Sequence, residues 1–287
     1  MEAARPKTLP AAIIPVMVGT ALAAAHGSAN YVSAFNCLVF SLLIQVGTNF
    51  ANDYFDFVQG ADTAARVGPR RAVAAGLIAP RTMLAATWIV LAAAFAVGLL
   101  LVREGGWILL PIGIVSIVCA IAYTGGPYPL GYNGLGDLFV FIFFGLVAVC
   151  ATFYVQVHVV TPDAVSCAAG VGLLAANILV ANNYRDVETD AQAGKKTLVV
   201  RFGRKFALWQ YGLSVLVALA CPPALMLTGG YRWPVLLPLV LAPWASRLTH
   251  RLGRSCEPGE QIAILGDTAK FLAAFGILLS AGVWFGR

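Results

Sequence analysis

The chain has 287 residues, of which 60% are hydrophobic and only 11% are charged, and its formal net charge is +6. Soluble domains are about half apolar and about a quarter charged. This composition therefore excludes an ordinary soluble domain and indicates an integral membrane protein. The six cysteines are scattered without paired spacing, which favours buried thiols over a metal–thiolate centre.

Apolar runs long enough to cross a bilayer, about 20 residues each, recur along the whole chain. No segment alternates in polarity with a period of two over about ten residues, so the spans are predicted to be helices and not strands. Two of them, the first and the eighth, are short and contain proline. We predict nine spans, at roughly Pro10–Ala25, Ser33–Phe50, Met83–Val102, Trp107–Tyr123, Leu135–Gln156, Ala164–Ala181, Phe206–Leu227, Pro234–Leu248 and Ile262–Phe285.

The basic residues predict how these spans are oriented. With the N-terminus inside, only Arg103, Arg232 and Arg287 of the 19 Lys and Arg residues fall in the outer segments. Loops on the cytoplasmic side carry such an excess of Lys and Arg. We therefore predict a multi-pass protein of the cell inner membrane with a cytoplasmic N-terminus. Its positive charge reflects topology and does not predict binding of nucleic acid. No cleavable signal peptide is expected, because the first ten residues lack a separate apolar core and a cleavage site.

Two related polar motifs stand at the inner ends of apolar runs. The first is Asn52-Asp53-Tyr54-Phe55-Asp56, followed by Gly60 and Asp62. The second is Asn182-Asn183-Tyr184-Arg185-Asp186, followed by Asp190, Gly194, Lys195 and Lys196. The repetition indicates an internal duplication, and hence a single membrane domain over residues 1–287 with two pseudo-symmetric halves.

These motifs predict a site for a metal-bound diphosphate. Residues four apart share one helix face, so each motif presents its oxygen atoms in one direction. Oxygen ligands suit Mg²⁺, especially where phosphate groups of a substrate complete the coordination shell. The candidate metal ligands are Asn52, Asp56, Asp186 and Asp190. Cations in the N-terminal segment and the adjacent loops would bind the phosphates, and the candidates are Lys7, Arg70, Arg71, Lys195 and Lys196.

A third candidate segment, Tyr123–Asp137, lies between the fourth and fifth predicted spans. Its glycines and prolines favour an irregular backbone that could cover a site. Tyr123, Tyr128 and Tyr132 could line the cavity and stabilise a carbocation through their ring faces, although an interfacial aromatic belt would have the same composition.

With these motifs the chain resembles the UbiA-type intramembrane prenyltransferases over essentially its whole length. Asn52-x-x-x-Asp56 is similar to the first motif of that family, and Asp186-x-x-x-Asp190 to the second. Arg5-Pro6-Lys7-Thr8-Leu9-Pro10 and the Gly-rich segment resemble the branch that prenylates 1,4-dihydroxy-2-naphthoate in menaquinone biosynthesis. Asp62 departs from the pattern, because it lies six residues after Asp56 where many relatives have an acid three or four residues after.

The resemblance implies an all-α fold in which nine transmembrane helices form a ring around a central cavity. Loops 2–3, 4–5, 6–7 and 8–9 would cap the cavity from the cytoplasmic side. It also implies a Mg²⁺-dependent reaction, in which a polyprenyl group passes from its diphosphate to the naphthoate ring and the carboxyl group leaves as CO₂. The product would be a demethylmenaquinone. Asp53, Asp137 and Tyr123 are candidate catalytic residues, of which Asp53 and Asp137 would position the aromatic acceptor or take its proton.

Two alternatives remain open from the sequence. The acceptor could be 4-hydroxybenzoate, homogentisate or another aromatic molecule, which would keep the reaction class. The chain could instead be a secondary transporter, since transporters also have repeated halves and intramembrane charge. Transport is disfavoured because the polar residues lie at the inner ends of the predicted helices and not midway along them.

Overall fold

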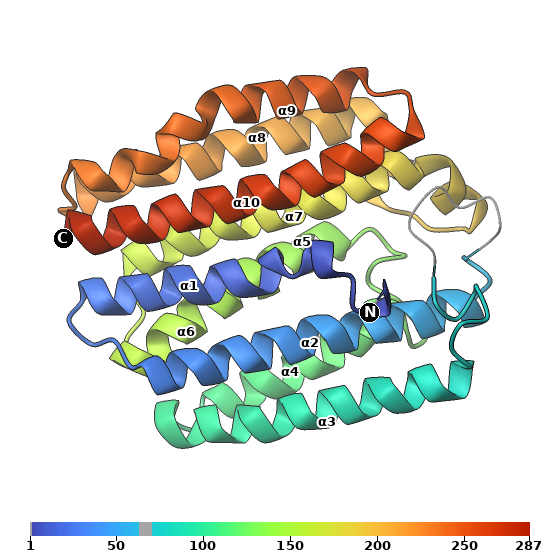
Figure 1. The fold of residues 1–287 in the computed structure, drawn as a ribbon, viewed down its shortest axis with the longest axis horizontal. Coiled ribbons are helices and arrows are strands. Elements are labelled where there is room, and N and C mark those ends of the chain that lie inside the picture. The colour runs from blue at the N-terminus through green and yellow to red at the C-terminus, as the bar shows by residue number, and fades with distance from the viewer. Residues whose placement is uncertain (1, 63–70) are drawn as a thin grey trace.

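The computed structural model describes residues 2–62 and 71–287, and within this part of the chain it contains helices and turns but no β-strand. The long helices lie side by side along one direction (Figure 1). Two short 3₁₀ turns, η1 (Glu2–Ala4) and η2 (Pro6–Thr8), come first. The helices that follow are α1 (Pro10–Ala25), α2 (Tyr31–Val58), α3 (Pro80–Gly105), α4 (Leu109–Ala122), α5 (Gly136–Val140), the π-helical stretch η3 (Phe141–Val147), α6 (Ala148–Val157), α7 (Pro162–Gln192), α8 (Leu198–Thr228), the 3₁₀ stretch η4 (Trp233–Leu241), α9 (Ala242–Arg254) and α10 (Pro258–Gly286).

Six of these helical segments are long and apolar enough to cross a membrane, namely α2, α3, the continuous stretch Gly136–Val157, α7, α8 and α10. The apolar helices α1 and α4 are shorter, with 16 and 14 residues. The protein is therefore a multi-pass α-helical membrane protein. The predicted eighth span differs from a regular helix, because it consists of η4 followed by the polar-faced helix α9. The closed ring of nine spans remains a prediction.

The two motif-bearing helices extend beyond their apolar runs. The run that ends at Phe50 continues as helix to Val58, and the run that ends at Ala181 continues to Gln192. Both Asn/Asp motifs are thus helical, as the four-residue spacing requires, and they lie in the last turns of α2 and α7. Each helix carries the carboxylates of its motif near its C-terminal end.

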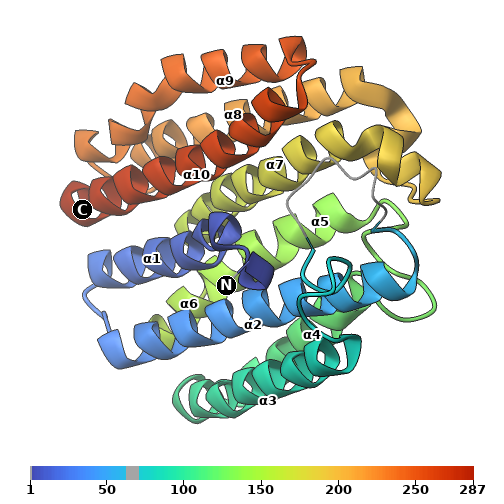
Figure 2. The same ribbon diagram turned by 45° about the vertical axis from the view of Figure 1, so that its right-hand side comes forward.

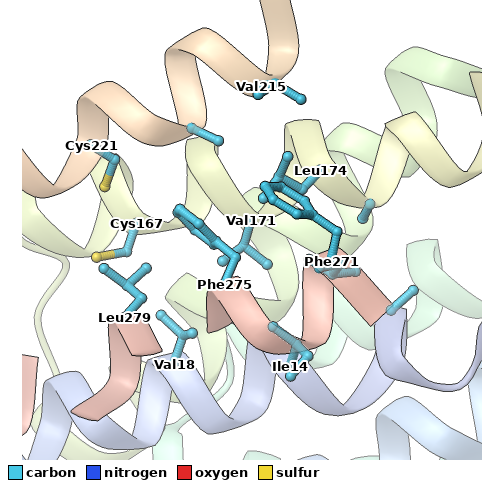
Figure 3. Packing of buried hydrophobic residues seen from close by; sticks show 14 of the residues in the cluster. Ile14, Val18, Cys167, Val171, Leu174, Val215, Cys221, Phe271, Phe275 and Leu279 are labelled. Atoms are coloured by element: carbon cyan, nitrogen blue, oxygen red, sulfur yellow. The ribbon is translucent and has the colours of Figure 1, made fainter. Parts of the chain in front are cut away.

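The main core is formed by α1, α7, α8 and α10. Phe271 and Phe275 of α10 point toward Val171 and Leu174 of α7 (Figure 3). Helices in lipid associate mainly through close packing, and small residues permit the closest approach. Such a contact joins η3 to α7, where a Cβ atom at Gly145 would lie 2.7 Å from the Cα of Gly172.

The connections that carry the predicted site gather at one end of the helix bundle, on the right in Figure 1. The end of α2, the start of α3, the α4–α5 connection and the α7–α8 connection all lie there (Figures 1 and 2). A backbone hydrogen bond of 2.7 Å from Lys196 N to Tyr132 O joins the last two connections. The fold therefore brings segments from both halves of the chain to the same place.

Candidate functional site

A cavity of about 600 Å³ extends into the helix bundle from the end that carries the motifs. Its lining on α2 changes from Cys37 and Phe40 to Asn52 and Asp56 as the helix approaches that end. α7 contributes a similar change, from Ile178 to the carboxylates of the second motif. The apolar part is lined by residues that include Leu101, Leu109, Ile112, Phe139, Phe143 and Val147. The cavity therefore suits a ligand with a charged head and a long apolar tail.

Asp56 of the first motif is the centre of a dense set of contacts. Its Oδ2 atom accepts a 2.8 Å hydrogen bond from Arg71, and its Oδ1 atom accepts a 2.7 Å hydrogen bond from the Tyr132 hydroxyl. Arg71 Nε also lies 3.4 Å from Asp62 Oδ1. Asn52, one turn earlier on α2, accepts a 2.8 Å hydrogen bond from the Thr124 hydroxyl. The side chain of Asp56 is 3% exposed, and a carboxylate so buried requires such partners.

Asp186 of the second motif is paired with its own neighbour in sequence. Arg185 donates from Nε to Oδ1 at 2.7 Å and from Nη2 to Oδ2 at 2.6 Å, which is a bidentate geometry. A further bond of 2.9 Å runs from Arg185 Nη2 to the Asn182 side-chain oxygen. The Arg185 side chain is 1% exposed. The pair is therefore a buried ion pair that lines the cavity.

Lys195 connects the two motifs. Its Nζ atom lies 3.4 Å from Asp56 Oδ1 and 3.6 Å from Asp190 Oδ1, and it stands 4.6 Å from the centre of the Tyr132 ring. The first and second motifs thus converge on one cation at the charged end of the cavity. The two acidic motifs therefore lie on either side of Lys195.

The two carboxylates predicted to be catalytic have structural partners. The Asp53 oxygens accept hydrogen bonds from the backbone amides of Ala72 and Val73, at 3.0 and 3.3 Å. Asp53 therefore fixes the backbone directly after Arg71. Asp137, at the start of α5, accepts a 3.1 Å hydrogen bond from Gln210 of α8 and is not among the residues that line the cavity in the described part of the chain.

The remaining predicted residues divide between the cavity and the surface. Tyr123 and Tyr132 line the cavity, whereas Tyr128 is 59% exposed. The Lys196 side chain is exposed, in contrast to that of Lys195. Arg70 lies outside the described residues, and so does the side chain of Lys7.

Burial and nearby carboxylates set the protonation of the two cavity tyrosines. Burial, followed by the negative charge of Asp56, raises the pKa of Tyr132 above its usual value. Burial, followed by the charges of Asp137 and Asp56, raises the pKa of Tyr123 in the same direction. Both effects disfavour the phenolate. The two hydroxyl groups therefore remain protonated at neutral pH and act as hydrogen-bond donors.

The sequence analysis missed two arginines that line the cavity, Arg5 and Arg185. Arg5 begins the Arg5–Pro10 segment that carries the family resemblance, but the sequence pattern gives it no role of its own. Arg185 directly precedes Asp186 inside the motif. Arg185 lies four residues after the end of an apolar run, on the same helix. An arginine buried beside a membrane span needs a partner, and this requirement could have identified it together with the adjacent Asp186.

The donor set fits a hard divalent cation in chemistry, although the protein side chains alone do not form a complete site. Among residues 2–62 and 71–287, no three His, Cys, Asp or Glu side chains lie together as a metal cluster. The carboxylates of Asp56 and Asp186 are instead paired with arginines and Lys195. Oxygen ligands are those that Mg²⁺ prefers, and Mg²⁺ is commonly held by one or two carboxylates together with substrate phosphates. The residues present are therefore compatible with a metal that binds together with a diphosphate.

These features define a class: a multi-pass membrane protein whose cavity joins an apolar half to a buried, charged end built from two repeated motifs. The family model described as "UbiA prenyltransferase family" matches residues 12–281. The chain belongs to the UbiA prenyltransferase family, as the motifs indicated.

Curated relatives align over almost the entire chain. It is 38% identical over 287 residues to the 1,4-dihydroxy-2-naphthoate octaprenyltransferase of Mycobacterium tuberculosis, covering 100% of this chain and 97% of that protein. It is 36% identical over 293 residues to the protein of the same name from Haemophilus influenzae, covering 99% of this chain and 95% of that protein.

A solved structure shares the fold. The UbiA homologue from Archaeoglobus fulgidus bound to DMAPP and Mg²⁺ superposes with a TM-score of 0.69 and 17% sequence identity, covering 96% of this chain and 97% of that one. At this identity the similarity concerns the fold.

Proposed function

We propose that this protein transfers a polyprenyl group from its diphosphate to 1,4-dihydroxy-2-naphthoate, which gives demethylmenaquinone in its reduced, quinol form in menaquinone biosynthesis. The ring carbon that bears the carboxylate forms the new C–C bond, and the C–O bond to the diphosphate breaks with its electron pair on oxygen. The carboxylate leaves as CO₂, and the electrons of its bond return to the ring. The observation that carries the proposal is the convergence of Asp56, Asp190 and Lys195 at the charged end of a cavity with an apolar remainder. The names of the curated relatives support the choice of acceptor.

The diphosphate would bind between the two motifs. Asn52, Asp56, Asp186 and Asp190 would hold Mg²⁺, which would neutralise charge on the diphosphate and so improve it as a leaving group. Arg71 and Lys195 would bind the phosphate oxygens, because they are the cations already held beside Asp56. Fixed positive charge where negative charge develops lowers the barrier to ionisation. For Lys7, Arg70 and Lys196, a role in phosphate binding remains a prediction.

The polyprenyl chain would occupy the apolar half of the cavity. Phe139 and Phe143 lie there with their rings stacked at 6.0 Å. Tyr132 and Tyr123 lie closer to the motifs and would turn their rings toward the allylic carbon, where a ring face stabilises positive charge. A dry, apolar wall around this carbon would also protect the cation from water.

For Asp53 and Asp137 we propose indirect roles. Asp53 would position Arg71 by holding the next two backbone amides. Asp137 would hold the start of α5 against α8, since it accepts a hydrogen bond from Gln210. Neither proposal requires these carboxylates to take a proton from the acceptor.

The orientation follows from the basic residues. We propose that the end with the motifs faces the cytoplasm, with the N-terminus on that side, in a single membrane domain of nine spans. The loops between α2 and α3, α4 and α5, α7 and α8, and α9 and α10 would form the cap. A water-soluble acceptor and Mg²⁺ would then reach the site from the cytoplasm, while the lipid substrate would enter from the bilayer.

The proposal is tested with purified protein, labelled polyprenyl diphosphate, Mg²⁺ and a panel of aromatic acceptors, with the products identified by mass spectrometry. We expect a decarboxylated, prenylated product from 1,4-dihydroxy-2-naphthoate, formed faster than any product from 4-hydroxybenzoate or homogentisate. If another acceptor formed product faster, that acceptor would replace the naphthoate in the proposal, and the reaction class would stay the same. If no acceptor led to release of diphosphate, the enzyme assignment would be contradicted and a transporter would become the better hypothesis.

A further inference from the structure

Helix α9 presents a basic face away from the core. Its side chains Ala245, Leu248 and Leu252 are buried in the main core, and the helix lies next to α8 at one flank of the bundle (Figures 1 and 2). Arg247 and Arg254 are exposed and, because they are seven residues apart, they share the opposite face of the helix. A helix with one apolar and one basic face is typical of the boundary between lipid and water.

Lys205 of α8 extends this basic face. Leu208 of α8 lies against the end of α9, since a Cβ atom at Gly253 would be 3.4 Å from the Leu208 side chain. Lys205 is exposed and lies about one helical turn before Leu208. It therefore stands beside the end of α9 that carries Arg254. These three exposed cations, Lys205, Arg247 and Arg254, form a basic patch that is contributed by two helices.

The cations of the basic patch differ from their neighbours, which have protein partners. Arg204 pairs with Glu188 at 2.9 Å, and Arg251 pairs with Asp267 at 3.0 Å. Among the described residues, none forms a hydrogen bond or an ion pair with the side chains of the basic patch. The positive-inside tendency concerns the loops between spans, and it does not require cations on the outward faces of two packed helices. The basic patch is thus available to an anionic ligand.

An apolar stripe of α8 continues directly from the basic patch. Trp209, Leu213 and Leu216 follow Lys205 at helical spacing, and all three are exposed. Because α8 is long and apolar enough to cross a membrane, these side chains would face the lipid. A ligand at this place would therefore meet positive charge at one end and apolar side chains at the other. An anionic phospholipid has this chemistry, since its phosphate binds Lys and Arg while its acyl chains cover apolar surface.

We propose that the basic patch binds the headgroup of an anionic phospholipid whose acyl chains lie along the Trp209 stripe. The inference is independent of the proposed reaction, because it concerns the lipid-facing surface of the bundle and not the central cavity. In the proposed orientation the basic patch faces the cytoplasmic leaflet, where anionic lipids give the membrane surface a negative potential. The bound lipid would hold the start of α8 to the end of α9.

Trp209 provides the reporter for a test. The purified full-length protein is reconstituted into phosphatidylcholine vesicles with increasing fractions of brominated phosphatidylglycerol or, in a parallel series, brominated phosphatidylcholine. Bromine on an acyl chain quenches the fluorescence of a nearby tryptophan, so the two series give the affinity for phosphatidylglycerol relative to phosphatidylcholine. The contribution of Trp209 is the difference between the wild type and Trp209→Phe.

Two triple variants separate the basic patch from total charge. The test variant combines Lys205→Gln, Arg247→Gln and Arg254→Gln. The matched control removes the same charge from three exposed arginines elsewhere on the protein, and combines Arg81→Gln, Arg103→Gln and Arg232→Gln. Thermal melting is recorded for every variant. The three single substitutions of the basic patch, each expected to lose part of the preference, replace the test variant if it does not fold.

Each basic residue near an anionic membrane surface contributes roughly 5-fold in binding. We therefore expect the Trp209 signal to show a preference for phosphatidylglycerol of roughly 5-fold or more in the wild type and in the control. The test variant should show no preference. Equal quenching by both lipids in the wild type overturns the inference, and so does an equal loss in the control, which would assign the effect to total charge. A preference that is independent of Trp209 would place the lipid elsewhere. A preference that inorganic phosphate abolishes would assign the basic patch to a soluble anion, and either result also overturns the inference.

Discussion

The Nζ atom of Lys195 lies between two carboxylates from opposite halves of the chain, 3.4 Å from Asp56 Oδ1 and 3.6 Å from Asp190 Oδ1. Carboxylates that converge in a buried site repel one another unless a cation joins them. Lys195 supplies that cation from the α7–α8 connection. In the proposed function, a metal-bound diphosphate would meet both motifs at this point.

Lys195→Ala should weaken binding of the diphosphate. Loss of one charge-assisted hydrogen bond predicts a drop in kcat/KM for the polyprenyl diphosphate of roughly 10- to 100-fold. Lys196→Ala is the matched control, because it removes the same charge from the next residue, whose side chain is exposed. Steady-state kinetics with the donor varied should separate the two variants. An equal loss of kcat/KM in both variants would show that the total charge of the loop matters and that the position of Lys195 does not.

Asp186→Asn should raise the Mg²⁺ concentration needed for activity. The variant retains the shape of the side chain but loses the negative charge, and a catalytic metal is worth several kcal/mol of charge stabilisation, so kcat/KM should fall by roughly 100-fold or more. In the wild type, EDTA should stop product formation and excess Mg²⁺ should restore it. Melting temperature is the necessary control, because the substitution leaves Arg185 without its buried counter-charge. Activity that persists in EDTA would exclude the metal.

Asp53→Asn should act through the backbone that follows Arg71. The amides of Ala72 and Val73 would lose one of their two charged acceptor atoms, at a cost of about 1–3 kcal/mol. We expect a lower melting temperature and a higher KM for the diphosphate, since Arg71 would be less well fixed. The acceptor KM should change little. A selective loss of kcat with a normal melting temperature would instead favour a direct catalytic role for Asp53.

Tyr132→Phe tests the hydrogen bond to Asp56 and the raised pKa of Tyr132. Because the pKa is higher in the folded state than in the unfolded chain, the folded protein retains this proton in a pH range where the unfolded chain has lost it. The resulting stability is present below the ordinary tyrosine pKa of about 10 and is lost as pH rises above it. The melting temperature of the wild type should therefore fall more steeply above about pH 10 than that of Tyr132→Phe. Parallel curves for the two proteins would contradict this assignment.

Gly145→Ala should destabilise the contact between η3 and α7. The new Cβ atom would lie 2.6 Å from Ala168 O and 2.7 Å from the Cα of Gly172, both backbone atoms that cannot rotate away. Overpacking of this kind costs about 1–3 kcal/mol. Gly266→Ala on α10 is the control, since no atom lies within 4 Å of its added Cβ. The melting temperatures of the two variants in detergent are compared. An unchanged melting temperature in Gly145→Ala would show that η3 and α7 can move apart without loss of stability.

The helical class and the two motifs could be predicted from the sequence because both depend on local spacing. Long apolar runs can cross a bilayer only as helices when no period-two pattern is present. Within a helix, residues 52 and 56, or 186 and 190, must share a face. The family resemblance added that the two motifs meet, which spacing alone does not require.

Roles within the motifs depended on how each helix is rotated in the bundle. Asp53 and Asp56 are both acids in the last turns of α2, but Asp53 contacts the backbone at residues 72 and 73, whereas Asp56 faces Arg71, Tyr132 and Lys195. In the α7–α8 connection, Lys195 lies between Asp56 and Asp190, whereas the side chain of the neighbouring Lys196 is exposed. The rotation follows from packing against distant helices, which no local pattern contains.

The sequence by itself thus determined that this protein is a helical membrane protein with two repeated oxygen-rich motifs at the ends of two of its apolar runs. It could do so because composition and helical periodicity are properties of contiguous residues. Only the tertiary structure decided that Lys195 joins the motifs, that Arg185 neutralises Asp186, and that the N-terminal segment carries Arg5 to the cavity. Those contacts are set by the packing of segments far apart in the chain, together with the need of every buried charge for a partner.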